Sequence, residues 1–174
     1  MYVLIPLLPL AAFLVLGLAG NRIKERAHLV AVPAVVLSWM LSVFAFFDVA
    51  QGAPISQPLY SWLTSGHLDI HIGLYLDRLT VVMLLLVTTV SSLVHIYTIG
   101  YMHGEAGYAR FFSYIALFTF SMLMLVLADN LLQLFVFWEA VGLCSYLLIG
   151  HWYERAPACA AATKAFLVNR VGDF

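Results

Sequence analysis

The stretch from Leu131 to Gly150 reads LLQLFVFWEAVGLCSYLLIG, and Glu139 is the only acidic residue within it. About 20 consecutive apolar residues cross a bilayer as one helix, so this stretch predicts a membrane-spanning helix with Glu139 near its middle. A charged side chain at that depth costs at least about 2.5–3.5 kcal/mol to insert. We therefore expect either that a partner inside the protein offsets this cost, or that Glu139 moves protons or ions.

The whole chain has the composition of a membrane protein. Of its 174 residues, 64% are hydrophobic and only 10% are charged, whereas a soluble domain has about 25% charged residues. We therefore predict an all-α polytopic membrane protein whose surroundings are the lipid bilayer. The net charge is −1 and there is no basic run, so nucleic acid is not an expected partner. Without a cysteine cluster or a dinucleotide-binding glycine pattern, we expect no metal and no cofactor in this chain.

Six apolar segments are long enough to span a bilayer. We expect six membrane-spanning helices, at about residues 2–20, 29–50, 79–100, 110–128, 130–151 and 157–174. Pro157 fits the first turn of the sixth helix, where its missing N–H is not needed. That helix reaches the last residue without a C-cap or a following polar loop, so we expect the sequence to be the N-terminal part of a longer protein.

One segment between the second and third helices has the pattern of a strand. Residues 67–76 read HLDIHIGLYL, with an apolar residue at every second position from Leu68 to Leu76. This alternation is typical of a half-buried strand. With residues 58–63 as a partner strand and Thr64-Ser65-Gly66 as the turn, it predicts a small extracytoplasmic β-hairpin at about 58–76. Because an isolated hairpin is marginally stable, we expect it to rest on helix ends or on a neighbouring subunit.

The basic residues of the loops predict the orientation. The first, third and fifth loops carry five of them, and the second and fourth loops carry one: Arg22, Lys24, Arg26, Arg110 and Arg155 against Arg78. Since cytoplasmic loops are enriched in Lys and Arg, the odd-numbered loops are expected in the cytoplasm and the N-terminus outside.

Four more ionisable residues are candidates for a proton path with Glu139. Lys164 and Arg170 on the sixth helix lie within about a turn of Glu139 in depth, so either cation is a possible partner. Asp173 shares a face with Arg170 and is either its counter-ion or a second relay carboxylate. Lys164 is long enough to reach the aqueous interface instead. His95 is the weakest candidate, because a single His is more often structural, although it titrates near neutral pH.

Three neighbours of Glu139 on its own helix were expected to be structural. Gly142 and Ser145 are small, so we expect them to let a neighbouring helix approach closely. Trp138 is expected to pack against lipid or at an interface.

The chain also resembles a known family. The runs VLADNLL at 126–132 and WEAVGLCSYLLIG at 138–150 resemble subunit L of the proton-pumping NADH-quinone oxidoreductases, respiratory complex I. The run KAFLVNRVGD at 164–173 resembles the next helix of that family, and YMHGE at 101–105 with YARFF at 108–112 also fits. The resemblance implies that Glu139 is a proton-channel residue, with Arg170 and Asp173 in the same channel.

The resemblance also implies an architecture and a setting. Residues 1–109 would hold the three leading helices and the hairpin, and residues 110–174 the incomplete start of the first antiporter-like repeat. The lysine that usually partners the glutamate lies on a seventh helix beyond this sequence. The chain would be a proton-translocating membrane-arm subunit in the bacterial inner membrane, coupled to quinone reduction elsewhere in the complex. NADH, FMN, iron–sulfur clusters and quinone would be bound by partner subunits, and the fragment alone is not expected to be active.

Two other functions remain open at this point. The chain is alternatively part of the large subunit of a multisubunit cation/proton antiporter, which exchanges Na⁺ or K⁺ for H⁺ without quinone. It is otherwise a truncated fragment without function.

Overall fold

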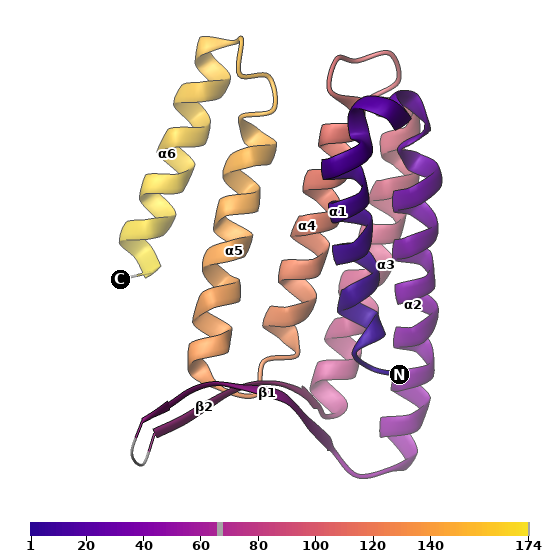
Figure 1. Cartoon of the computed structure of the whole chain (residues 1–174), viewed down its shortest axis with the longest axis vertical. Helices are drawn as coiled ribbons and strands as arrows, with labels where there is room; N and C mark the ends of the chain where they lie inside the picture. The colour runs from indigo at the N-terminus through magenta and orange to yellow at the C-terminus, as the bar shows by residue number, and fades with distance from the viewer. Residues whose placement is uncertain (66–67, 174) are drawn as a thin grey trace.

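A computed structural model describes residues 1–65 and 68–173 of the chain as a helical bundle with one hairpin (Figure 1). In chain order the elements are α1 (Leu4–Ile23), the 3₁₀ turn η1 (Lys24–Arg26), α2 (His28–Gln51), β1 (Ile55–Ser65), β2 (Leu68–Leu76), α3 (Arg78–Tyr101), α4 (Tyr108–Val126), α5 (Leu131–Ile149) and α6 (Ala156–Asp173). The mostly helical fold and the antiparallel hairpin are confirmed. The first strand begins at Ile55, earlier than expected. Thr64 and Ser65, which were expected in the turn, belong to β1 because they pair with β2. Gly66 and His67 lie outside the described residues.

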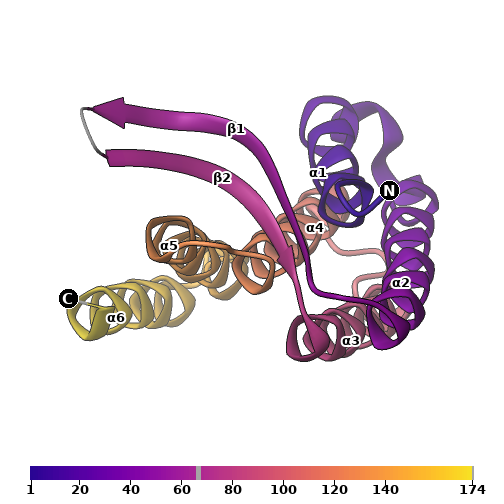
Figure 2. The same ribbon diagram turned by 90° about the horizontal axis from the view of Figure 1, so that it is seen from below.

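The helices form a bundle with an extension on one side. Seen from below, α1 to α4 cluster together, and α5 and α6 continue in a row away from α4 (Figure 2). Within this arrangement α4 contacts α1, α3 and α5, and α6 packs against α5. Two buried clusters fill the interior. One lies toward the hairpin and includes Ile5, Leu84 and Leu123, and the other lies toward the opposite end and includes Leu16 and Phe112.

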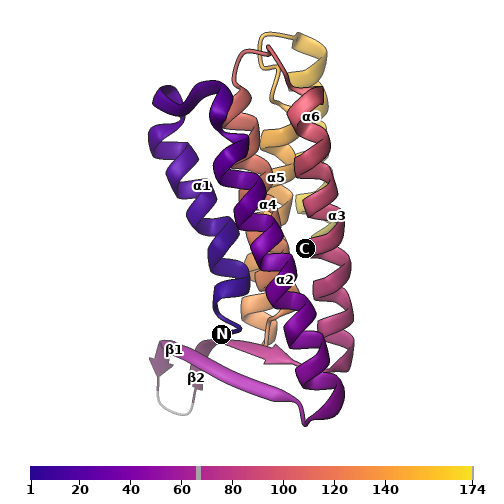
Figure 3. The same ribbon diagram turned by 90° about the vertical axis from the view of Figure 1, so that its right-hand side faces the viewer.

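Four of the described helical segments are long and apolar enough to cross a membrane. They are Lys24–Gln51, Arg78–Tyr101, Tyr108–Val126 and Leu131–Ile149. The apolar part of α1, Leu4–Gly20, is shorter, and α6 carries three ionisable residues. The connections after α1, α3 and α5 all lie at one end of the bundle, opposite the hairpin (Figure 3). The expected separation of basic residues is therefore present in space, while the number of spans and the side facing the cytoplasm remain predictions.

Buried hydroxyl groups allow the helices to pack in apolar surroundings. Ser42 on α2, and Thr88 and Ser92 on α3, each donate to the carbonyl oxygen four residues earlier, at distances of 2.7–2.9 Å. Ser38 instead donates to the carbonyl oxygen of Ile5 on α1, at 2.6 Å. Because every hydroxyl proton has an acceptor, these small polar side chains do not leave an unsatisfied donor in the bundle.

Side-chain caps begin the two helices next to the hairpin. Asp77 caps α3 by accepting from the Thr80 amide at 2.7 Å, and Asn130 caps α5 by accepting from the Gln133 amide at 2.8 Å. The Thr80 amide holds the pKa of Asp77 below its usual value. The caps fix where the chain leaves the hairpin and where it turns between α4 and α5.

The hairpin rests on the helix ends through β2. Leu74 and Leu76 are fully buried in the core cluster, and the Tyr75 amide donates to the Leu127 carbonyl at the end of α4, at 2.9 Å. Gln133 on α5 forms two hydrogen bonds with the backbone of Gly73, each 3.0 Å long. The expected contact with helix ends is therefore confirmed for this part of the strand. Leu59, Tyr60 and Trp62 on β1 are exposed instead.

Candidate functional site

Glu139 on α5 and Arg170 on α6 form an ion pair, with Nη1 of Arg170 donating to Oε2 of Glu139. The Glu139 side chain is 15% exposed and that of Arg170 is 37% exposed. Antiparallel packing of α5 and α6 brings the two residues together. Their similar expected depth, from the rise per residue of each helix, allowed this contact. The guanidinium group therefore offsets the charge of a carboxylate that would otherwise be isolated at this depth.

The second carboxylate oxygen of Glu139 is not paired. Within residues 1–65 and 68–173, Oε1 is buried and has no hydrogen-bond partner. A buried acceptor without a partner carries a free-energy cost of about 1–3 kcal/mol. Such an atom is a place where a proton or a water molecule can bind.

A second contact joins the same two helices. Trp138 donates its indole N–H to Oδ1 of Asp173 at 2.9 Å, next to the ion pair. Trp138 is 52% exposed, which agrees with the expected position against lipid or at an interface. The hydrogen bond from its indole N–H to a carboxylate was not predicted. Among the described residues no ion pair joins Asp173 to Arg170, so Asp173 is not the counter-ion of Arg170 in this conformation.

The structure does not bring Lys164 to Glu139. Lys164 is exposed on α6, and the described part of the chain offers it no ion pair or hydrogen bond. Lys164 and Arg170 are six residues apart, which turns their side chains about 120° away from each other around the helix axis. Of these two cations, only Arg170 therefore faces α5.

Phe166 belongs to the site and was missed in the sequence. Its ring centroid lies 4.9 Å from the guanidinium carbon of Arg170 and 5.5 Å from the ring of Tyr146 on α5. The signal was available, since Phe166 and Arg170 are four residues apart and share a helix face. The ring supports the guanidinium group from one side through a cation–π contact.

Gly142 and Ser145 do not serve close helix packing, so that expectation is wrong. A Cβ atom added to Gly142 would have no neighbour within 4 Å. Both residues instead line a cavity of about 310 Å³ between α4, α5 and α6, together with Asn169 and Asp173. The small side chains leave this space open, and Asp173 and Trp138 border it.

His95 lies away from the ion pair, on α3. It is 1% exposed, and its Nδ1 lies 2.8 Å from the carbonyl oxygen of Ser91. Ser91 Oγ in turn lies 2.6 Å from Thr119 Oγ1 on α4, while His95 Nε2 has no hydrogen-bond partner within the described chain. Through the described residues no hydrogen bond or ion pair links His95 to Glu139. No group of three or more His, Cys, Asp or Glu side chains that could hold a metal ion occurs among them either.

Family comparison gives matches over two parts of the chain. Residues 62–112 match the family described as "NADH-Ubiquinone oxidoreductase (complex I), chain 5 N-terminus". Residues 128–174 match the family described as "NADH:quinone oxidoreductase/Mrp antiporter, TM", and this second match contains Trp138, Glu139, Arg170 and Asp173.

Individual relatives agree with the family comparison. NADH-quinone oxidoreductase subunit L of Neisseria meningitidis serogroup A is 52% identical over 178 residues, covering 100% of this chain and 26% of the relative. The Rickettsia typhi subunit L is 47% identical over 174 residues, and the match covers 99% of this chain and 27% of that relative. The chain thus spans about a quarter of the length of the curated relatives it matches.

A solved structure shares the fold. It is the membrane-bound sulfane sulfur reductase, an archaeal respiratory membrane complex, with a TM-score of 0.81, 18% identity, and coverage of 99% of this chain and 34% of that one. At this identity the likeness concerns the fold alone. Two family models match parts of this chain, and the whole chain is similar to about a quarter of subunit L. Together these findings show that this chain belongs to the subunit L family of NADH-quinone oxidoreductases.

Proposed function

We propose that this chain is part of a proton-translocating membrane-arm subunit of NADH-quinone oxidoreductase, and that Glu139 carries the proton. The observation that supports this most strongly is the half-satisfied carboxylate: Oε2 is paired with Arg170, and Oε1 is buried without a partner in the described chain. An intramembrane carboxylate that is stabilised by one cation and retains one open oxygen can exist in both protonation states.

Arg170 controls which state is favoured. While its guanidinium group contacts Glu139, the positive charge stabilises the ionised carboxylate. Moving the guanidinium group away removes that charge, so a proton at Oε1 then replaces it. Asp173 is the available acceptor for the displaced guanidinium, since it lies three residues from Arg170 on the same helix face.

Trp138 opposes the movement of the Arg170 guanidinium group from Glu139 to Asp173. Its N–H occupies Oδ1 of Asp173, which reduces the capacity of Asp173 to attract Arg170. The cavity beside Gly142, which Asp173 lines, provides room for the Asp173 side chain to rearrange without displacing a helix. The exchange proposed here does not involve Lys164 or His95, whose part in a proton path stays a prediction.

The energy source and the partners lie outside the chain. Relatives named as NADH-quinone oxidoreductase subunits belong to multisubunit complexes. We propose that other subunits of such a complex bind NADH, FMN, iron–sulfur clusters and quinone, and that neighbouring membrane-arm subunits contact this one in the bacterial inner membrane. Quinone reduction would drive the exchange at Glu139 from a distance.

The test is proton pumping by membranes that contain the complete subunit with Glu139→Gln. Glutamine keeps the size of the side chain but cannot carry the proton. Proton uptake per NADH oxidised in inside-out vesicles is expected to fall. The matched control is Glu154→Gln, which replaces an exposed carboxylate in the α5–α6 connection and is expected to leave proton uptake unchanged. Wild-type stoichiometry in the Glu139→Gln vesicles would refute the proposal.

A cation/proton antiporter subunit is the second candidate. The observation that favours it is that the match over residues 128–174 covers Mrp antiporters as well as quinone oxidoreductases. Membranes from a strain lacking the gene would then lose Na⁺- or K⁺-driven proton exchange and retain NADH-driven pumping. The opposite result supports the first candidate.

A further inference from the structure

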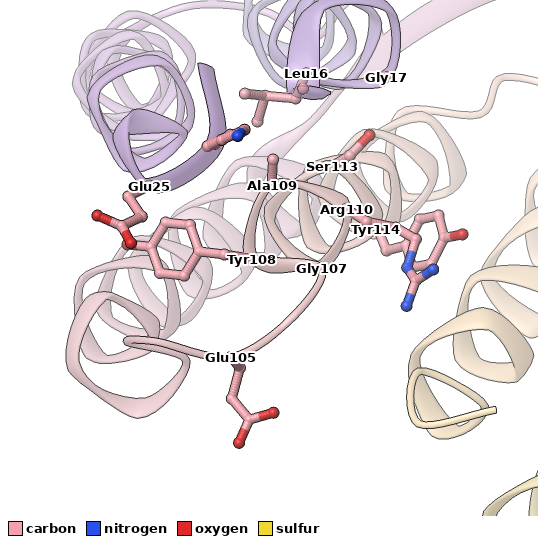
Figure 4. Close-up of a pocket in the computed structure, with 12 residues that line it drawn as sticks. Leu16, Gly17, Glu25, Glu105, Gly107, Tyr108, Ala109, Arg110, Ser113 and Tyr114 are labelled. Carbon is pink, nitrogen blue, oxygen red and sulfur yellow. The ribbon is translucent and has the colours of Figure 1, made fainter. Parts of the chain in front are cut away.

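A second polar site lies away from the ion pair, in a cavity of about 610 Å³ between the end of α1 and the start of α4 (Figure 4). It lies at the end of the bundle opposite the hairpin. Two cations, Lys24 and Arg110, line it together with two carboxylates, Glu25 and Glu105. The proton path proposed above uses none of these residues.

The four charges do not neutralise one another. No ion pair joins these cations to these carboxylates anywhere in residues 1–65 and 68–173. Arg110 donates one N–H to the carbonyl oxygen of His151 at 3.2 Å and lies over the ring of Tyr153, which leaves its other N–H groups available. Glu105 accepts from the indole N–H of Trp152 at 3.4 Å. A wall with equal numbers of unpaired cations and anions is complementary to a zwitterion and not to a simple anion or cation.

The start of α4 adds donors for the negative part of such a ligand. Gly107 precedes the helix with φ 88°, and no side chain caps the first amides. Uncapped amides at a helix start carry partial positive charge. A Cβ at Gly107 would lie 3.1 Å from Nη2 of Arg110, so the glycine leaves space for the guanidinium group beside these amides.

The opposite wall is held by a strained residue. Lys24 has φ 45° and ψ −115°, and it is the one residue other than glycine with a positive φ among those described. Such a conformation costs about 1–3 kcal/mol and persists only where the surroundings impose it. In this case it sets Lys24 and Glu25 together on the wall of the cavity.

The wall on the α1 side is apolar. Leu16, Gly17 and Gly20 line it, and Gly20 is the last residue of the apolar segment Leu4–Gly20. The charged groups therefore lie at the boundary of the apolar segment, with space for an apolar chain beside Gly17, which is exposed. A ligand that fits has a zwitterionic head at this level and an acyl chain alongside α1 and α4.

We propose that this cavity binds a phospholipid whose headgroup joins a phosphate diester to a primary ammonium group, as in phosphatidylethanolamine. The phosphate oxygens accept from Arg110, Lys24 and the first amides of α4. The ammonium group donates to Glu25 and Glu105, which a methylated headgroup such as that of phosphatidylcholine cannot do. This site is independent of the proton path and stands whether or not the proposed function is right.

The test uses membranes from cells that make the affinity-tagged, full-length protein. A phosphatidylethanolamine with a photoreactive group in its acyl chain is crosslinked in place, and the labelled peptides are identified by mass spectrometry. Label is expected on segments 16–25 and 105–114, about tenfold above that from the matched phosphatidylcholine probe, since one lost charge-assisted hydrogen bond is worth about that factor.

Three variants report on the site. Lys24→Gln with Arg110→Gln, and Glu25→Gln with Glu105→Gln, are each expected to lose about tenfold in label at these two segments. Gly17→Leu fills the apolar wall without changing a charge and is expected to do the same. Arg22→Gln, in the last turn of α1 but outside the cavity, is expected to match the wild type. A misfolded variant differs from these because it changes the labelling of every segment with both probes.

Three outcomes would overturn the proposal. Equal labelling by the two probes would show that the headgroup is not recognised. Unchanged labelling in the charge variants would show that the four charges do not bind it. Loss of label when inorganic phosphate is added would show that the site takes a free anion in place of a lipid.

Discussion

Trp138 and Asp173 are joined by a hydrogen bond of 2.9 Å from the indole N–H to Oδ1, directly beside the ion pair of Glu139 and Arg170. Two consecutive residues on α5 therefore hold two residues on α6 that are three positions apart. Arg170 binds one carboxylate, that of Glu139, and Trp138 donates to the other, that of Asp173. In the proposed exchange, the distribution of Arg170 between the two acids therefore depends on Trp138, which has no charge.

Replacing Trp138 by Phe tests this dependence. The ring is retained, but Oδ1 of Asp173 loses its donor and becomes free to attract Arg170 away from Glu139. A hydrogen bond to a charged group contributes about 1.5–3 kcal/mol, so NADH-driven proton pumping is expected to fall by about tenfold or more. The measurement is the initial rate of proton uptake by inside-out vesicles at equal NADH oxidation.

The double variant Trp138→Phe with Asp173→Asn provides the control. Asparagine attracts Arg170 much less than aspartate does, so pumping is expected to recover toward the wild-type rate. Trp62→Phe on the exposed hairpin is expected to have no effect. If the double variant pumps no better than Trp138→Phe alone, the competition between the two carboxylates does not exist.

Gly73 is expected to tolerate no side chain. A Cβ at this position would lie 2.0 Å from Oδ2 of Asp129, which itself lies 2.9 Å from Nε2 of His71. Gly73→Ala should therefore push β2 away from the α4–α5 turn and lower the free energy of unfolding by about 1–3 kcal/mol. Faster chymotrypsin cleavage at the hairpin is the readout. Gly100→Ala, with no neighbour within 4 Å, should leave the cleavage rate unchanged.

Gln133 is expected to hold the hairpin through hydrogen bonds alone. It is 2% exposed, and its amide group donates to the Gly73 carbonyl and accepts from the Gly73 N–H. Gln133→Leu fills similar space but leaves both backbone groups unsatisfied, at about 1–3 kcal/mol each. Thermal unfolding of the purified protein should shift to lower temperature. An unchanged transition would mean that the buried leucine contacts Leu74 and Leu76 are sufficient to hold the strand.

His151 is expected to make the α5–α6 connection sensitive to acid. Burial, and then the nearby charge of Arg110, lower the pKa of His151 below 6.5, with opposing contributions from Glu105 and Ala106. The unfolded chain therefore binds this proton at higher pH than the folded chain does. The stability that neutral His151 contributes is complete above about pH 6.5 and is lost as the pH falls below that value.

Hydrogen exchange of residues 105–110 measures this effect. Protection is expected to decrease between pH 6.5 and 5 in the wild type and to be flat in His151→Phe, which keeps an aromatic ring against Phe111 and Trp152. His103→Gln, in the connection between α3 and α4, should retain the wild-type dependence of protection on pH. The same slope in His151→Phe would assign the acid sensitivity to another group.

The helices and the hairpin were predictable because their signals are local. An apolar run of about 20 residues defines a spanning helix, and alternation between Leu68 and Leu76 defines a strand. The start of β1 at Ile55 was missed because Ser56 and Gln57, which precede the expected strand at residues 58–63, are both polar and interrupt the alternation. Their strand conformation comes from pairing with β2, where Ile55 lies opposite Leu76.

The sequence predicted the level at which the site residues lie along their helices, but not which way their side chains point. Counting residues placed both Lys164 and Arg170 near the level of Glu139, and only the rotation of α6 about its axis selects Arg170. Likewise, the spacing of Gly142 and Ser145 indicated small residues, but whether a helix or a cavity lies opposite depends on how α4, α5 and α6 diverge. Contacts of this kind arise from tertiary packing and leave no periodic pattern in the sequence.

The most direct test of the central claim is infrared difference spectroscopy of the assembled complex during NADH-driven turnover. If Glu139 takes up and releases the proton, the C=O band of a protonated carboxyl group should change amplitude in the wild type and disappear from the difference spectrum of Glu139→Gln. The exposed-carboxylate variant Glu154→Gln should retain the band. A difference spectrum of Glu139→Gln identical to that of the wild type would contradict the account.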